Sequence, residues 1–140
     1  LIRQYTPFNL EYISTNYILD TIKDKVKIIN YPTSIRNISE KLYSVKYQKY
    51  TPRTFFSQDI NVIINFFKIH KKIILKPIHG YGGNDIHLLN KFNLDFIKKF
   101  IKKHNHIMCQ KFLPKISRGD KRIFLINGKI CGAISRIPKQ

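Results

Sequence analysis

The chain has 140 residues, which is enough for one ordinary domain with a hydrophobic core. Hydrophobic residues make up 43% of the sequence, so we expect a folded globular protein. No apolar run is long enough to cross a bilayer, and the first residues do not form a signal peptide. The chain lacks an initial Met, from which we expect it to be a piece of a longer protein.

The chain is also strongly basic, with 26 Lys and Arg against 8 Asp and Glu and a formal net charge of +18. Such a charge suits nucleic acid or another anionic partner. The lysines are scattered, however, and no nucleic-acid-binding motif accompanies them. The excess of Lys, Asn, Ile, Tyr and Phe is typical of an AT-rich genome. We therefore favour compositional drift with a solvated surface, and a nucleic-acid-binding module is the alternative.

Periodicity and turn signals predict a mixture of helices and strands. In chain order these are a helix over 9–25, a buried strand over 26–29, a helix over 34–45, a short strand over 54–56, a helix over 57–67, strands over 72–76 and 86–89, a helix over 94–103, a strand over 106–112 and a hairpin over 121–126 and 129–136. The expected helix N-caps include Asn9, Thr33 or Ser34, and Ser57. Because strands and helices do not alternate strictly, we expect an α+β fold with largely antiparallel sheets.

Two further local features follow from the sequence. Asn127-Gly128 is the pair preferred in a tight two-residue hairpin turn. Cys109 and Cys131 each lie in an apolar, strand-like stretch, without a Cys or His partner at zinc-ligand spacing. We expect two buried free thiols in a reducing cytoplasm.

The segment 73–86, I-I-L-K-P-I-H-G-Y-G-G-N-D-I, carries the clearest functional pattern. An apolar strand ends at Lys76 and is followed at once by Gly80, Gly82 and Gly83. Glycine adopts positive φ and lets main-chain N–H groups approach an anion closely. An ammonium group beside such a loop predicts a site for a polyphosphate, most simply that of ATP.

The spacing differs from the two commonest phosphate-binding loops. A P-loop places its Lys after the glycines, and a Rossmann fingerprint opens a helix. Here Lys76 precedes the glycines, and Ile86 begins another predicted strand. We therefore expect a hairpin flap laid over a ligand, and a hairpin whose turn merely requires glycine is the alternative.

Several motifs follow one another in a specific order. They are T-P-F-N-L-E-Y-I-S-T-N-Y-I-L at 6–19, S-I-R-N-I-S-E-K-L at 34–42, I-L-K-P-x-x-G-x-G-G at 74–83, G-D-K-R at 119–122 and S-R-I-P at 135–138. In order and spacing they are similar to bacterial glutathione synthetases, which have the ATP-grasp fold. G-D-K-R alone would be weak, but several motifs in register are specific. The resemblance covers essentially the whole chain.

The resemblance implies an incomplete ATP-grasp fold. Residues 1–39 would be the tail of an α/β N-terminal substrate domain. Residues 40–109 would form the whole small ATP-grasp subdomain, and residues 110–140 would begin a truncated large subdomain.

The resemblance also implies roles for individual residues. Lys41 and Lys76 match the two lysines that hold the ATP phosphates in this family, and Gly80, Gly82 and Gly83 would form the flap. The main chain of four residues matches the hinge that meets the adenine edge: Gln110, Lys111, Phe112 and Leu113. For Lys41 considered without its motif, an exposed helix lysine is the simpler interpretation.

Three charged residues near the chain end complete the implied site. Asp120 matches G-D-K-R on the nucleotide side. Arg122 and Arg136 match G-D-K-R and S-R-I-P as catalytic residues, where a guanidinium would pair with a carboxylate or the transferred phosphate. The alternative for each is a surface salt bridge. Asp85 and His87 are expected at loop and strand surfaces.

The implied reaction joins glycine to γ-glutamylcysteine. The carboxylate of γ-glutamylcysteine attacks the terminal phosphate of ATP, and the glycine amine captures the acyl phosphate, giving glutathione, ADP and phosphate. ATP and Mg²⁺ are the expected cofactors, small-molecule substrates the expected partners, and the cytoplasm the expected compartment. The resemblance is compatible with a homo-oligomeric parent enzyme. Another ATP-grasp carboxylate–amine ligase and an inactive remnant are the remaining alternatives.

The sequence departs from the family at its end. It stops at Gln140, where the family continues into a lid loop and a cluster of carboxylates and Asn that binds magnesium. The eight acidic residues form no pair at metal-ligand spacing near the chain end. We therefore assign no metal ligand within this chain and expect the Mg²⁺ ligands in the missing C-terminal part.

Without those ligands we predict that the chain alone does not turn over ATP. Supplied with ATP, Mg²⁺, γ-glutamylcysteine and glycine, it is expected to release no ADP above background in a coupled assay. ADP release that requires both γ-glutamylcysteine and glycine would contradict this prediction.

Overall fold

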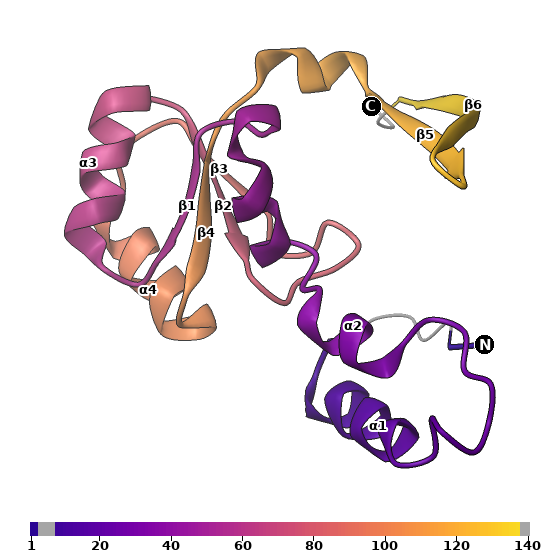
Figure 1. Cartoon of the computed structure of the whole chain (residues 1–140). Coiled ribbons are helices and arrows are strands. Elements are labelled where there is room, and N and C mark those ends of the chain that lie inside the picture. Colours follow the sequence, from indigo (N-terminus) through magenta and orange to yellow (C-terminus); the bar gives the residue numbers. More distant parts are fainter. Residues whose placement is uncertain (3–7, 138–140) are drawn as a thin grey trace.

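The computed structural model describes residues 1–2 and 8–137 of the chain (Figure 1). Its α-helices are α1 (Leu10–Asp20), α2 (Pro32–Asn37), α3 (Ile60–His70) and α4 (Leu94–His104), and its 3₁₀ helices are η1 (Leu42–Tyr50) and η2 (Pro114–Arg118). Its strands are β1 (Thr54–Ser57), β2 (Ile73–Pro77), β3 (His87–Leu89), β4 (Ile107–Lys111), β5 (Asp120–Ile126) and β6 (Lys129–Arg136).

The centre of the fold is a four-stranded sheet in the order β1-β4-β2-β3, in which every neighbouring pair is antiparallel. Helices α3 and α4 cover one face of this sheet, and η1 lies on the other side (Figure 1). Strands β5 and β6 form a separate antiparallel hairpin, which stands away from the sheet at the end of η2 (Figure 1). The prediction of an α+β fold with antiparallel sheets is confirmed.

The hydrophobic core lies between the sheet and its two helices. Along β2 the side chains alternate, so that Ile73 and Leu75 are buried toward the helices while Ile74 and Lys76 face the opposite side. The cluster of buried residues comprises Ile63, Phe67, Ile73, Leu75, Leu89, Ile97, Phe100, Ile107 and Cys109. Burial raises the pKa of the Cys109 thiol to about 12, so this cysteine is an inert part of the core.

The helices covering the sheet begin at side-chain caps. The carboxylate of Asp59 accepts a hydrogen bond from the Asn61 N–H at 2.8 Å, and Asn93 accepts one from the Phe96 N–H at 2.9 Å. The predicted cap Ser57 is wrong, because this residue ends β1 and its hydroxyl oxygen accepts from the Asp59 N–H. The residue that caps α3 is Asp59, two positions after Ser57.

Helices α1 and α2 are joined by a cluster around one arginine. The Arg36 guanidinium lies 2.6 Å from the Asp20 carboxylate, 4.0 Å from the centre of the Tyr17 ring, and donates to the Asn16 carbonyl at 3.1 Å. These contacts hold the pKa of Asp20 below its usual value, chiefly through the hydrogen bond from Arg36. In α1 itself, the predicted N-cap Asn9 is confirmed by its bond from the Tyr12 N–H.

The N-terminal third departs from prediction in four places. The expected N-cap Thr33 or Ser34 is wrong, because α2 begins at Pro32 and its N-cap is Tyr31, which makes no side-chain capping bond. The first helix ends at Asp20 rather than near residue 25. The expected strand over 26–29 does not form, because its only strand-like contact in the described chain is the bond from the Ile2 N–H to the Ile29 carbonyl. The second predicted helix is interrupted at Ile38, with φ −103° and ψ 79°, and continues as the 3₁₀ helix η1.

The C-terminal hairpin confirms one prediction and corrects another. Asn127 and Gly128 have φ of 49° and 76°, as a two-residue turn of this class requires. Cys131 was expected to be buried, but it is exposed, because in the described part of the chain no element packs on either face of β5 and β6. Thr6, Pro7 and Pro138, which belong to two of the quoted motifs, lie outside the described residues. None of the helices described is long and apolar enough to cross a membrane.

A pair of leucines tests the position of the core. Leu75 is fully buried against α3 and α4, whereas Leu88 on the adjacent strand is 46% exposed. We predict that Leu75→Ala lowers the free energy of unfolding by about 2–5 kcal/mol through lost burial and a residual cavity. Leu88→Ala should cost much less in the same denaturant titration. Equal losses from the two variants would contradict this placement of the core.

Candidate functional site

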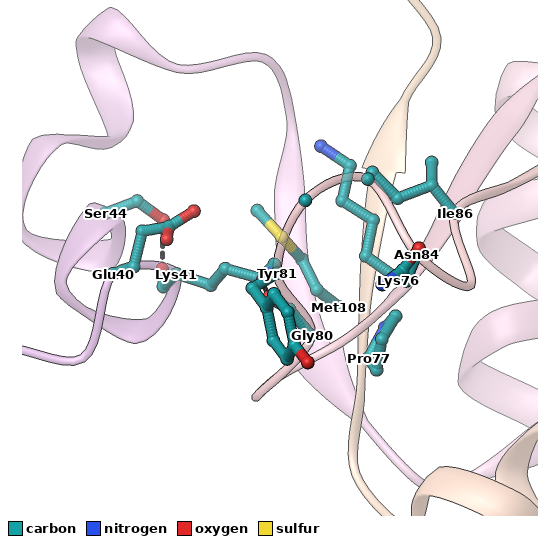
Figure 2. Close-up of a pocket in the computed structure, with 12 residues that line it drawn as sticks. Glu40, Lys41, Ser44, Lys76, Pro77, Gly80, Tyr81, Asn84, Ile86 and Met108 are labelled. Atoms are coloured by element: carbon teal, nitrogen blue, oxygen red, sulfur yellow. Dashed lines mark hydrogen bonds between the residues drawn. The ribbon is translucent and has the colours of Figure 1, made fainter. Parts of the chain in front are cut away.

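The cavity next to the glycine loop has a volume of about 260 Å³ and is built from three parts of the chain. The turn before η1 contributes Glu40 and Lys41, and Ser44 follows within η1. Strand β2 and the loop after it contribute Lys76, Pro77, residues 80–84 and Ile86. Figure 2 shows the Lys41 side chain extending toward Gly80 and Tyr81, and Met108 of β4 also lines the cavity. Residues 36 positions apart in sequence therefore share one small space.

The two predicted phosphate lysines line this cavity together. Lys41 donates a hydrogen bond to the Gly80 carbonyl, and Lys76 donates one to the side-chain oxygen of Gln110 at 2.9 Å. The pKa of Lys76 is lowered, first by burial and then by the positive charge of Lys41, while Glu40 acts in the opposite direction. The two ammonium groups are thus close enough to repel each other, which is the arrangement that attracts a polyanion.

The glycine loop joins two antiparallel strands, as predicted, and its glycines are required for two different reasons. Gly82 and Gly83 have φ of 61° and 81°, in the region that other residues adopt rarely. A Cβ on Gly80 would lie 2.5 Å from Cγ of Pro77, so this position is closely packed. The loop therefore needs glycine for backbone conformation at two positions and for space at the third.

The loop is anchored at both of its ends. Lys41 holds the Gly80 carbonyl at the start, and at the end the Asp85 carboxylate lies 2.8 Å from Lys103 and 3.5 Å from His104 on α4. The hydrogen bond from Lys103 lowers the pKa of Asp85. Between the anchors, Gly82 and Gly83 line the cavity, and a Cβ added to either would meet no other atom within 4 Å.

The predicted hinge lies at the opposite end of the sheet from the glycine loop. Lys111 pairs with Ile73 at the start of β2, whereas Ile107 pairs with Pro77 at its end. Four strand residues span about 13 Å, so the hinge and the loop are separated along the sheet face. This spacing suits an extended ligand that lies along the strands.

Two main-chain N–H groups of the hinge already donate hydrogen bonds within the protein. The N–H of Lys111 donates to the Arg53 carbonyl at 2.8 Å, and the N–H of Phe112 donates to the Lys72 carbonyl at 3.2 Å. An adenine would therefore have to use the hinge carbonyls or the N–H of Leu113, whose side chain is half exposed. Gln110, in contrast, reaches the cavity lysine through its side chain, a contact that the sequence analysis did not predict.

The three charged residues near the chain end do not line the cavity. Asp120, Arg122 and Arg136 all lie on the β5–β6 hairpin, which Figure 1 shows standing apart from the sheet. Arg136 donates through Nε to Asp120 at 3.0 Å and forms a second, short contact through Nη2. This bidentate pair lowers the pKa of Asp120 and corresponds to the surface salt bridge that was the alternative.

Several lining residues were missed by the sequence analysis. They are Glu40, Ser44, Pro77, Tyr81, Asn84, Ile86 and Met108. Glu40 is adjacent to Lys41 and could have been found from the motif, whereas Met108 is identified only by the strand pairing. His87 was expected at a strand surface, but it is half buried and its ring packs against Phe96 and Phe100, at 5.0 and 5.4 Å.

The described residues do not fit a magnesium site. Among them no group of three or more His, Cys, Asp or Glu side chains could hold a metal ion. Glu40 is the one carboxylate on the cavity wall, and Asp120 is paired with Arg136 on the distant hairpin. The cavity is cationic, and its chemistry is that of an anion-binding site.

Comparisons with known proteins agree with this chemistry. The family model "Prokaryotic glutathione synthetase, ATP-grasp domain" matches residues 40–140, and the model of the N-terminal domain of the same family matches residues 1–36. The chain belongs to the prokaryotic glutathione synthetase family. Its similarity to the family extends over both domain models, and the resemblance stated from the motifs is confirmed.

Individual relatives of the family show how much of a full-length protein is represented. The chain is 34% identical over 142 residues to glutathione synthetase from Bradyrhizobium diazoefficiens, covering 99% of the chain and 45% of the relative. It is 36% identical over 146 residues to glutathione synthetase from Shewanella oneidensis, covering 100% of the chain and 46% of the relative. The chain therefore spans about half the length of these curated relatives.

Solved structures show the same fold at lower identity. The D-cycloserine synthetase DcsG matches with a TM-score of 0.73 at 13% identity, over 91% of this chain and 47% of that one. The ATP-grasp ligase PsnB, complexed with a minimal precursor, matches with a TM-score of 0.67 at 17% identity, over 94% of this chain and 44% of that one. The prediction of a partial ATP-grasp fold is confirmed.

The repulsion between the two cavity lysines can be measured. We predict that Lys41→Met raises the pKa of Lys76, because it removes a positive charge that disfavours the Lys76 ammonium. The measurement is a pH titration of the Lys76 ¹³Cε signal, assigned by its loss in Lys76→Arg.

The matched control is Lys46→Met, whose ammonium lies over the Tyr43 ring rather than in the cavity. It should leave the Lys76 titration unchanged. A Lys76 pKa that stays constant or falls in Lys41→Met would show that the two charges do not share the cavity.

Proposed function

We propose that this chain forms the ATP-phosphate-binding part of an ATP-dependent carboxylate–amine ligase whose reaction is glutathione synthesis. The observation that carries the proposal is the convergence of Lys41, Lys76 and a positive-φ glycine loop on one cavity. Two ammonium groups offset the charge of a triphosphate, and main-chain N–H groups of the loop bind its oxygens. The family membership supports the choice of ligase chemistry.

The nucleotide would lie along the face of the sheet opposite α3 and α4. Its phosphates would occupy the cavity at the end of β2. Its adenine would meet the hinge at Lys111, Phe112 and Leu113, near Arg53 and Lys72, which directly precede β1 and β2. The alternation of β2 and β4 turns Lys76 and Gln110 toward this face. The glycine loop would then close over the phosphates from the β2–β3 turn.

In the complete enzyme, the carboxylate of γ-glutamylcysteine would attack the terminal phosphate of ATP. The P–O bond to ADP breaks, an acyl phosphate forms, and the glycine amine displaces phosphate to give glutathione. Lys41 and Lys76 would stabilise the charge that develops on the transferred group. We propose that Arg122 and Arg136 act at the reacting carboxylate or phosphate, with Asp120 on the nucleotide side. This requires the hairpin to face the cavity. Mg²⁺ would accompany ATP, and we assign none of its ligands to the described residues.

The division into an N-terminal tail, a small subdomain and the start of a large one remains our proposal for residues 1–39, 40–109 and 110–140. Two free cysteines, one of them exposed, are compatible with a reducing cytoplasm. Another ATP-grasp ligase would use the same phosphate grip, and matches to both glutathione synthetase domain models favour glutathione synthesis over it.

We predict that the chain binds ATP and that Lys76→Met and Lys41→Met each weaken binding at least about tenfold, because each removes a charged hydrogen-bond donor to phosphate. Isothermal titration calorimetry with ATP measures the effect. Lys46→Met is the matched control on the neighbouring helix and should bind as the unmodified chain does.

The same titrations separate the nucleic-acid alternative. Salt-steep binding of a single-stranded RNA together with no measurable ATP binding would overturn the proposed function. ATP binding that is equally weak in Lys46→Met and Lys76→Met would contradict the assignment of the cavity.

A further inference from the structure

The cavity lysine Lys76 is held by a chain of polar side chains that crosses three strands. Its ammonium donates to Oε1 of Gln110 at 2.9 Å, and Nε2 of Gln110 donates to Oγ1 of Thr54 at 2.8 Å. The Thr54 hydroxyl in turn donates to the Pro52 carbonyl at 2.7 Å. This series of hydrogen bonds therefore runs from β2 through β4 to β1 and ends on a main-chain carbonyl.

The strand register places these groups together. Thr54 lies directly opposite Gln110, and Gln110 lies opposite Ile74, two residues before Lys76 on the same face of β2. All three polar side chains project from the face opposite α3 and α4. A shift of one residue in the register of either strand pair would turn one of these three side chains toward the core.

The donors and acceptors fit together in only one way. An ammonium has no acceptor, so Lys76 requires the oxygen of the Gln110 amide. A carbonyl has no donor, so Pro52 requires the hydroxyl proton of Thr54, which leaves the hydroxyl oxygen to accept from the Gln110 NH₂ group. Lys76 at one end of the hydrogen-bonded series and the Pro52 carbonyl at the other thus require the same orientation of the Gln110 amide.

We propose that Thr54 and Gln110 are positioning residues that hold the Lys76 ammonium in the phosphate site. This inference rests on the proposed function of the cavity. Gln110 supplies a neutral oxygen, which occupies one of the three ammonium protons and leaves the full charge and two protons for phosphate. Thr54 does not line the cavity, and its hydroxyl bonds Gln110 and the Pro52 carbonyl. It would act by preventing the Gln110 amide from turning its NH₂ group toward Lys76.

The second cavity lysine follows the same rule. Lys41 is held by the Gly80 carbonyl, which is again a neutral oxygen. Glu40 is the one carboxylate among the residues lining the cavity, and neither lysine forms an ion pair with it in the described structure. Both ammonium groups are therefore held by neutral oxygens rather than by an ion pair with a carboxylate.

The test uses four variants of the full chain: Thr54→Val, Thr54→Ser, Gln110→Met and the double variant with Thr54→Val and Gln110→Met. Thr54→Val removes the hydroxyl while keeping the branched shape, and Thr54→Ser restores the hydroxyl. Thr51→Val is the matched control, because Thr51 lies just before β1 and, among the described residues, its hydroxyl bonds the Gln48 carbonyl rather than Gln110.

We expect Thr54→Val to weaken ATP binding about fivefold to tenfold, because the Gln110 amide, which accepts from the Lys76 ammonium, is then no longer held in orientation. Adenosine affinity should not change, because adenosine has no phosphate for Lys76 to bind. Thr54→Ser and Thr51→Val should match the unmodified chain. In the Gln110→Met background, Thr54→Val should have no further effect.

A second readout does not depend on nucleotide. The ¹³Cε titration of Lys76 should move to lower pH in Thr54→Val and in Gln110→Met, because the ammonium loses its acceptor while Lys41 and Glu40, the charged groups that face it, are unchanged. Thermal unfolding of every variant checks that the sheet remains folded. A purely structural role of Thr54 would lower thermal stability without moving the Lys76 titration.

The outcomes are distinguishable. If the unmodified chain binds ATP and Thr54→Val changes neither ATP affinity nor the Lys76 titration, the inference is overturned while the proposed function stands. An effect of Thr54→Val that persists undiminished in the Gln110→Met background would also overturn it. If the unmodified chain does not bind ATP, the proposed function fails, and the Lys76 titration alone decides whether Thr54 and Gln110 hold the lysine.

Discussion

The site depends on bringing two ammonium groups into one partly buried space without letting a carboxylate neutralise either. Burial and mutual repulsion both disfavour the charged form of Lys76, as its lowered pKa shows. Each ammonium group donates a hydrogen bond to a neutral oxygen, Lys41 to the Gly80 carbonyl and Lys76 to the Gln110 side chain. Glu40, the one carboxylate among the described residues lining the cavity, offsets part of this positive charge but forms no ion pair with either lysine. A polyphosphate is the ligand chemistry that such a cavity stabilises most.

The antiparallel sheet makes this arrangement possible. Its register sets Thr54, Gln110 and Lys76 on one face, while α3 and α4 bury the other face in the core. The same register separates the hinge from the glycine loop by most of the length of β4. The core therefore fixes the distance between the two ends of the proposed nucleotide site, and a slipped strand would disrupt packing and ligand contacts together.

Local signals in the sequence were sufficient for the parts of the fold that are locally determined. The N-cap at Asn9, the Asn127-Gly128 turn and the alternating strand β2 were predicted because short-range chemistry decides them. The strand over 26–29 failed because a strand needs neighbours that the described chain does not provide. In the site, Lys41, Lys76 and the glycines were found from motifs, whereas the roles of Thr54 and the Gln110 side chain arise from strand pairing. Pairing between segments more than 30 residues apart leaves no local signal.

The central claim is that Lys41 and Lys76 bind the same polyphosphate under the glycine loop. The most direct measurement follows the ¹³Cε signals of all lysines and the amide signals of the loop glycines while ATP is added, with adenosine as the comparison. Our account predicts that Lys41, Lys76, Gly82 and Gly83 shift together with a single dissociation constant for ATP and do not shift with adenosine. Shifts confined to lysines outside the cavity, or a response of only one of the two cavity lysines, would contradict it.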